Sequence, residues 1–231
     1  MGRVTVGGSG TQVSVTEDAG VFGMKLVGAT TNSAGATVTG PSPSPATLSV
    51  DLGATNPNPG DIVNFTFKMP DGTTRDLKLT ATTSSPPGAG QFTIGATSTD
   101  TATNLQAALS QGVSTMAQTE LVAASAVQAG NDFFNTDASH PPQRVDGPPF
   151  DTATALRNGT SADTVSWYMG DNSTTDPRAT AQARVDNALT VSYGARASED
   201  AFRTAIQGVA LFVATSFSTT PSLTGAQEAN R

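Results

Sequence analysis

The spacing of the apolar residues changes near residue 98, and this change limits the fold more than any other feature of the sequence. Between residues 48 and 97 apolar and polar residues alternate, which is the period of a half-buried β-strand. Between residues 99 and 132 apolar residues recur every three or four positions, which is the period of an amphipathic helix. We therefore predict an α+β fold, elongated, in which β-hairpins pack with two or three α-helices.

One β-hairpin is predicted from local sequence. Residues 62–69 and 74–80 alternate, and the Pro-Asp-Gly-Thr sequence between them (residues 70–73) is typical of a turn. Residues that face each other across a hairpin share one side of the sheet. The apolar residues expected on that side are Phe65, Phe67, Leu77 and Leu79. Further short strands are predicted at 11–15, 23–27, 48–52 and 91–94.

The helical period predicts a helix that begins near residue 99, with Asp100 or Thr99 as its N-cap. The alanine-rich stretch 120–129 is predicted as a second helical segment, and a strand is the alternative there. The apolar stripe of the first helix consists of Leu105, Ala108, Leu109, Val113 and Met116.

Proline and glycine divide the chain into segments. The alternating Pro-Ser sequence at 40–45 predicts extended polyproline geometry, and therefore either a stiff linker or a surface loop. Repeated prolines and an Asn-Gly pair predict a loop over residues 135–162. The predicted organisation is a Gly/Thr-rich β or loop segment at 1–47, a domain of β-hairpin plus helix at 48–134, the loop at 135–162, and a hairpin with an amphipathic helix at 163–231.

Three elements are predicted in the first part of this last segment. Residues 164–169 indicate a strand, and residues 171–177 indicate a polar turn. Residues 181–185 and 188–193 can form a hairpin around an Asp-Asn turn.

A helix is then predicted to start at Ser198, which can cap it. Glu199 and Asp200 would place negative charge at the positive end of the helix dipole. Ala205 and Phe212 flank an apolar stripe, so two broad faces of this helix are apolar. Such a helix is expected to have partners on more than one side, in another chain or in a segment outside this sequence. The stripe consists of Phe202, Ile206, Val209, Val213 and Phe217.

Composition excludes several functions. The 231 residues carry a net charge of −7, which argues against nucleic-acid binding because that needs a basic surface. Without cysteine there is no disulfide, thiol nucleophile or thiolate zinc site, and one histidine excludes multi-histidine metal centres. The sequence contains no run of 18 apolar residues, so no membrane span is predicted and no membrane contact is expected. Only 13% of residues are charged, so a neutral, hydroxyl-rich surface is predicted.

Few residues are candidates for catalysis. A Ser-His-Asp hydrolase would need His140, which lies beside prolines in a predicted loop, and the sequence has no Gly-x-Ser-x-Gly motif. The carboxylate pairs Glu17-Asp18 and Glu199-Asp200 are adjacent, so their side chains diverge in a strand or helix. We therefore expect no catalytic residue and no enzymatic activity.

Two binding motifs have plain structural interpretations. The Asp-x-Ser-x-Thr sequence from Asp171 to Thr175 offers hard oxygen ligands, but no buried apolar strand precedes it, so a polar turn is predicted. Asn-x-Ser/Thr sequons begin at Asn64, Asn158 and Asn172, and this pattern recurs by chance in a threonine-rich chain. No metal, cofactor or cofactor-binding residue is expected.

A series of motifs after residue 163 resembles a known family. They are Thr-Val-Ser-Trp-Tyr at 164–168, Asp-Pro-Arg-Ala-Thr at 176–180, Ala-Arg-Val-Asp at 183–186 and Leu-Thr-Val-Ser-Tyr-Gly-Ala-Arg-Ala at 189–197, followed by an Ala/Phe-rich helix. This order resembles the carboxy-terminal part of bacterial flagellins, above all alphaproteobacterial flagellins and the related hook-filament junction proteins. Gln-Ala-Gly-Asn-Asp-Phe-Phe at 128–134 resembles their variable central region, and residues 62–113 resemble a small β-β-α insert of flagellar subunits.

The resemblance implies a structural subunit of the extracellular flagellar filament, exported unfolded through the flagellar channel without a signal peptide. Its partners would be other copies of the subunit, joined through terminal helices, with a flagellar export chaperone as a further candidate. Long terminal helices are missing from both ends of this sequence. We therefore interpret it as a central and C-terminal-proximal fragment, with 48–134 as the variable outer domain.

Two other functions stay open. One is a hook-filament junction (hook-associated) protein, which would form a single ring instead of a long polymer. The other is a cell-surface carbohydrate-binding or adhesin module, in which Trp167 and Tyr168 would stack on sugars. Neighbours on a strand face opposite sides, so at least one of these two rings is expected in the core.

Overall fold

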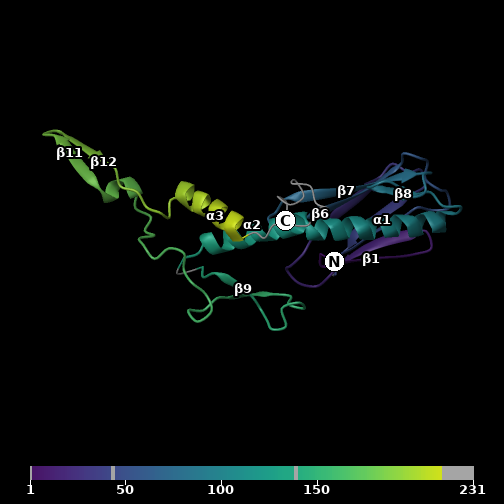
Figure 1. Ribbon diagram of the computed structural model, residues 1–231, viewed down its shortest axis with the longest axis horizontal. Coiled ribbons are helices and arrows are strands. Elements are labelled where there is room, and N and C mark those ends of the chain that lie inside the picture. Colours follow the sequence, from purple (N-terminus) through teal and green to yellow (C-terminus); the bar gives the residue numbers. More distant parts are fainter. Residues whose placement is uncertain (1, 43–44, 138–139, 215–231) are drawn as a thin grey trace. The chain divides into compact units, whose positions relative to one another are not determined.

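The computed structural model describes residues 2–42, 45–137 and 140–214, and its fold is α+β, as predicted (Figure 1). The chain forms two compact units. Within the described residues, unit 1 comprises 2–125 with 152–155, and unit 2 comprises 126–151 with 156–214.

The first sheet of unit 1 has four antiparallel strands in the order β1-β2-β5-β4. On β2 and β5 the valines and leucine that point inward are buried, and the hydroxyl residues between them face outward. This alternation is typical of a sheet with one covered face. The strands are β1 Val4–Ser9, β2 Gln12–Glu17, β4 Thr37–Ser42 and β5 Thr47–Asp51.

The predicted linker or loop at 40–45 is partly strand. Residues 40–42 complete β4, and Ser42 pairs with Thr47 of β5. Because β4 lies at the edge of the sheet, Pro41 does not have to donate a ladder hydrogen bond there. Residues 43–44 lie outside the described residues.

The second sheet of unit 1 has the order β3-β6-β7-β8 and contains the predicted hairpin. Phe65 lies opposite Leu77, and Val63 lies opposite Leu79, so the predicted shared apolar face is confirmed. β8, the predicted third strand of this region, pairs in parallel with β7. The strands are β3 Lys25–Thr31, β6 Ile62–Lys68, β7 Thr74–Thr82 and β8 Gln91–Thr93.

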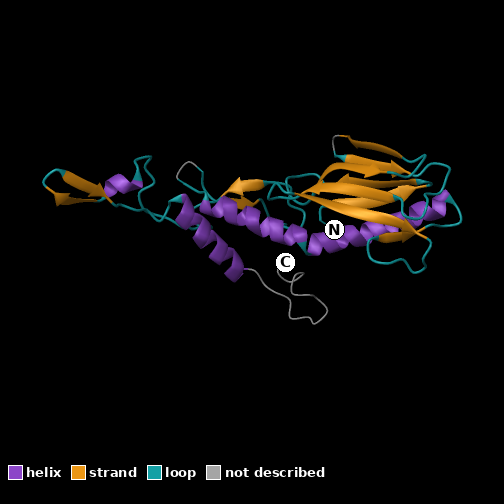
Figure 2. Ribbon diagram, turned by 90° about the horizontal axis from the view of Figure 1, so that it is seen from above, coloured by secondary structure: helices purple, strands orange, loops and turns teal. Residues whose placement is uncertain are grey.

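Helix α1 (Ser98–Gln118) packs on both sheets of unit 1. It contacts β1 and β2 of the first sheet and β7 and β8 of the second. Figure 2 shows it lying along these strands. The predicted stripe is buried here, with Leu105, Leu109 and Val113 at most 1% exposed. The core of unit 1 therefore lies between α1 and the two sheets.

The predicted N-cap of α1, Asp100 or Thr99, was wrong by three or two residues. Thr97 is the cap: its hydroxyl accepts a hydrogen bond from the Asp100 backbone N–H at 3.1 Å. The Asp100 carboxylate accepts in return from the Thr97 backbone N–H at 3.1 Å, which completes a capping box. Asp100 therefore contributes as the third helical residue and not as the cap.

Unit 2 is built from short elements. α2 (Glu120–Phe134) begins in unit 1 and ends in unit 2, which confirms the predicted second helix. The predicted loop 135–162 contains a small antiparallel ladder of β9 (Gln143–Val145) and β10 (Leu156–Asn158). The predicted hairpin is confirmed as β11 (Gln182–Asp186) and β12 (Leu189–Ser192).

Two predictions in unit 2 need correction. Residues 164–169 form no strand; the segment is irregular, and Trp167 and Tyr168 are half-buried. α3 (Asp200–Ala214) starts two residues after Ser198, which lies in the preceding turn. Phe217, the last residue of the predicted stripe, lies outside the described residues. With α1 and α2, α3 brings the described α-helices to three, as predicted.

Candidate functional site

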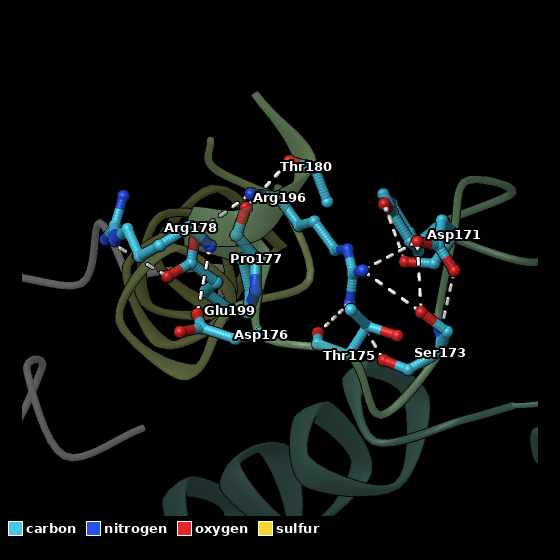
Figure 3. Close-up of polar contacts among 10 residues, drawn as sticks. Asp171, Ser173, Thr175, Asp176, Pro177, Arg178, Thr180, Arg196 and Glu199 are labelled. Atoms are coloured by element: carbon cyan, nitrogen blue, oxygen red, sulfur yellow. Dashed lines mark hydrogen bonds and ion pairs between the residues drawn. The ribbon is translucent and has the colours of Figure 1, made fainter. Parts of the chain in front are cut away.

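Two arginines hold the base of the β11–β12 hairpin, and we call this set of contacts the arginine clamp (Figure 3). Arg178 lies in the short 3-10 helix η1 (Pro177–Thr180), whose first turn is capped by the Asp176 carboxylate. The Arg178 guanidinium donates to the Gly194 carbonyl at 2.8 Å and pairs with Glu199 at 3.3 Å. Arg178 thus joins the residues before the hairpin to those after it.

Arg196 makes the second half of the clamp. Its guanidinium donates to the carbonyl oxygens of Ser173 at 2.8 Å and Thr175 at 2.9 Å. It also pairs with the Asp171 carboxylate at 2.7 Å. The side chain is only 8% exposed, so these are shielded, charge-assisted hydrogen bonds. Arg196 therefore ties the turn at 171–175 to the start of the α3 segment.

The clamp accounts for the Asp-x-Ser-x-Thr motif. The Asp171 carboxylate accepts from the backbone N–H of Ser173 at 2.8 Å and lies 3.1 Å from the Ser173 hydroxyl. These hydrogen bonds, and then the charge of Arg196, lower the pKa of Asp171. Because an arginine occupies this carboxylate, the motif is a polar turn, as predicted. Among the described residues no group of three His, Asp or Glu is placed to hold a metal ion.

A cavity of about 1090 Å³ lies in unit 2 beside the clamp. One wall is aromatic: the ring centroids of Phe134 and Trp167 are 5.3 Å apart, and those of Trp167 and Tyr168 are 5.4 Å apart. Arg196 lies in another part of the wall. The two neighbouring rings share the cavity because residues 164–169 are irregular, which the predicted strand would not have allowed.

The candidate catalytic residues do not converge. His140 is 78% exposed, and its Nδ1 lies 3.1 Å from the carboxylate of Asp137 in the same turn. Its neighbour Ser139 lies outside the described residues. The geometry at His140 is that of a local turn contact between exposed side chains.

The two carboxylate pairs have structural partners. Glu17 accepts from the backbone N–H of Leu26 at 2.6 Å and pairs with Lys25 at 3.6 Å. Asp18 is exposed. At the start of α3, Glu199 belongs to the clamp through Arg178, whereas Asp200 pairs with Arg203 at 2.7 Å. Neither pair presents two carboxylates to one point.

The three sequons lie in different settings. Asn64 is in the middle of β6, opposite Lys78. Asn158 is on β10, where its side chain accepts from Gln143 at 2.7 Å. Asn172 lies in the exposed turn next to the arginine clamp.

α3 carries a second notable surface. Its apolar stripe lies on the outside: Phe202, Ile206, Val209 and Val213 are between 43% and 77% exposed. The opposite side of α3 meets α2, where Gln207 donates to Asn131 at 2.7 Å and Leu211 packs close to Gly130. The helix therefore has one partnered side and one open apolar side.

The arginine clamp was not predicted from the sequence. A signal did exist, since Arg178 and Arg196 flank the predicted hairpin in a chain with few charges. Asp171 lies two residues before Ser173, and Asp176 lies directly before Pro177. Both sequences favour turns in which the side chain bonds to the backbone. What the sequence did not show was the pairing, because the contacts of Arg196 with the turn span 21 to 25 residues.

Comparison with known proteins finds no match for this chain among family models, curated proteins or solved structures. None of the helices in the described ranges is long and apolar enough to cross a membrane.

Proposed function

We propose that this chain is the surface-exposed part of a flagellin-type structural subunit of the extracellular bacterial flagellar filament. The observation that carries the proposal is the open apolar stripe of α3, formed by Phe202, Ile206, Val209 and Val213. A contiguous exposed apolar surface marks a protein contact. On an amphipathic helix such a stripe fits another helix of the same assembly.

The rest of unit 2 supports an assembled state. Phe134 is the one buried large hydrophobic side chain in the described part of this unit. The β11–β12 hairpin also exposes an apolar face, and an isolated two-stranded hairpin is only marginally stable. The side chains of this face, Val185, Leu189, Val191 and Tyr193, are between 45% and 65% exposed. A unit with two open apolar faces and little core suits a subunit that has several neighbours.

Unit 1 supports the outer position of this part of the subunit. It has its own core, so it can fold without neighbours. The outer face of its first sheet is hydroxyl-rich: Thr16 and Thr47 of adjacent strands bond to each other at 3.1 Å. Serine is depleted in protein–protein interfaces, and a face that satisfies its own hydroxyl groups offers few free hydrogen-bonding groups to a neighbour, so it suits a solvent-facing position.

The motifs that resemble flagellins build the arginine clamp, which directly precedes the helix that carries the apolar stripe. Asp-Pro-Arg-Ala-Thr at 176–180 forms η1 with its cap, and Leu-Thr-Val-Ser-Tyr-Gly-Ala-Arg-Ala at 189–197 forms β12 and supplies Arg196. Two arginines of these motifs form the clamp. A structural role explains why the charged residues of the arginine clamp pair with each other instead of surrounding a reactive centre.

Mass spectrometry of filaments sheared from the source organism tests the proposal. The informative tryptic peptide runs from Val185 to Arg196, because Arg184 and Arg196 are both cleavage sites. We expect this peptide as a major species of the filament fraction. A trace amount relative to the bulk subunit would assign the chain to the hook-filament junction instead. Its absence from filaments, with recovery in another cell fraction, would rule out the flagellar function.

A further inference from the structure

We propose that the cavity of unit 2 is a binding site for an uncharged oligosaccharide, a function separate from filament assembly. The cavity, of about 1090 Å³, is slightly larger than the range of about 300–1,000 Å³ typical of small-ligand sites, which suits a ligand of several sugar rings. Its walls combine aromatic rings with a large number of hydroxyl groups. The hydroxyl residues include Thr136, Thr160, Thr164, Ser166, Ser173 and Ser198.

The aromatic wall provides a platform for sugar rings. The Trp167 and Tyr168 rings lie 5.4 Å apart at an angle of 36°, so they contact each other, and both residues line the cavity. Phe134 also lines the cavity and contacts Trp167, with ring centroids 5.3 Å apart. The apolar face of a sugar ring packs against such a surface, while its hydroxyl groups stay free to bond elsewhere.

Three residues that line the cavity carry buried hydrogen-bonding atoms that lack a partner, and a ligand that reached these atoms would have to match them. Among the described residues, the Nε of Arg196, the indole Nε1 of Trp167 and the Oγ1 of Thr164 are buried without a hydrogen-bond partner. Buried polar groups normally have a partner. The first two are obligate donors, so the missing partner supplies acceptor oxygens, as the hydroxyl and ring oxygens of a sugar do. Trp167 and Thr164 belong to an irregular segment, which can adjust to bring them into contact with a ligand.

The charges in the wall favour an uncharged ligand. Arg196 is paired with Asp171 at 2.7 Å, and Arg203 is paired with Asp200 at 2.7 Å. Glu199 is paired with Arg178 at 3.3 Å. Because these cations already have carboxylate partners, an acidic sugar would gain no new ion pair and would lose its hydration.

The chain offers a direct assay, because Trp167 is its only tryptophan. The full chain is titrated with cellotriose, maltotriose and triacetylchitotriose, and with trigalacturonate as an acidic probe, while Trp167 fluorescence is recorded. We expect a saturable change with at least one neutral trisaccharide and a weaker response to trigalacturonate. The proposal is overturned if no neutral probe gives a saturable change, because water alone would then fill the cavity. Binding of trigalacturonate alone also overturns it.

The two tyrosines of the chain provide matched variants. Tyr168→Ala removes a ring of the platform, and we expect about tenfold weaker binding by calorimetry. Tyr168→Phe keeps the ring and should bind within about threefold of the parent chain. Tyr193→Ala, on the exposed hairpin outside the cavity, should leave affinity unchanged.

Equal losses of affinity in Tyr168→Ala and Tyr193→Ala, with unchanged circular dichroism, would contradict the site. These assays need no filament, so they fail or succeed independently of the proposed function.

Discussion

Two helical glycines show how differently single residues of the same type are constrained. A Cβ added to Gly112 of α1 would lie 2.6 Å from Cδ1 of Leu77 on β7, so the absence of a side chain allows the helix to approach the sheet. A Cβ added to Gly208 of α3 would meet no atom within 4 Å. The first glycine serves packing, whereas the second only lowers helix propensity.

Gly112→Ala is expected to destabilise unit 1 by about 1 kcal/mol, because the cost of overpacking against Leu77 exceeds the gain in helix propensity. Gly208→Ala is the matched control and should stabilise its helix by up to about 1 kcal/mol. Urea unfolding followed by far-UV circular dichroism measures both. If the two substitutions changed stability in the same direction, the close packing of α1 on β7 would be wrong.

Asp163 predicts a pH dependence at the scale of one carboxyl group. The backbone N–H of Thr160 and the guanidinium of Arg157 lower its pKa from 3.8 to about 2. Its folded pKa is below its unfolded pKa, so its stabilising contribution is present above about pH 4 and is lost as the pH falls toward 2. Carbon-13 NMR of the carboxyl group should show a midpoint near pH 2. In Arg157→Gln the midpoint should rise toward 3.8, and an unchanged midpoint would exclude the ion pair as a cause.

At the scale of elements, the β11–β12 hairpin depends on its anchor. All its residues are exposed, so it gains little from packing within the described chain. The clamp residues Arg178 and Arg196 join its two ends through carbonyl oxygens, which are positioned by the backbone and not by flexible side chains. The orientation of the hairpin base is therefore set by polar contacts.

Arg196→Ala is expected to destabilise unit 2 by about 1–2 kcal/mol, because it removes a largely buried guanidinium that binds two backbone carbonyl groups and the Asp171 carboxylate. Arg184→Ala is the control: Arg184 bonds only to the tip of the same hairpin and should cost less than about 0.5 kcal/mol. Trp167 fluorescence in urea reports on unit 2. Equal shifts of the two unfolding midpoints would mean that the clamp does not hold the hairpin.

The elements also show what a sequence can predict. The hairpin of β6 and β7 was predicted with its shared face, because alternation and a Pro-Asp-Gly turn are local properties. The strand predicted at 164–169 was wrong because Trp167 packs on Phe134, which is 33 residues away in the sequence. The arginine clamp and the cavity depend on such distant contacts, so local patterns could identify their residues but not bring them together.

At the scale of the whole molecule, the two units differ in how complete they are. Unit 1 buries the large side chains of its core fully, among them Phe65, Phe67 and Phe92. Unit 2 leaves the stripe of α3 and one face of its hairpin open to solvent. Unit 2 therefore has more apolar surface available for the contacts of the proposed assembly than unit 1 has.

Val209→Asp, made in the subunit expressed in the source organism, is expected to abolish filament formation, because it places a charge in the middle of the apolar stripe. Thr204→Asp, an exposed position of the same helix outside the stripe, should assemble normally. Electron microscopy of cells counts the filaments. Normal filaments in Val209→Asp would contradict the interface assigned to α3.

The position of α1 has a consequence for the order in which the chain can fold. The eight strands in the described part of unit 1 precede α1 in the sequence, yet α1 covers strands of both sheets. A chain that becomes available from its N-terminus, during synthesis or passage through a pore, therefore presents two uncovered apolar sheet faces until residue 118 has emerged. Unit 1 closes late, and α1 determines when the nascent domain stops being an aggregation-prone intermediate.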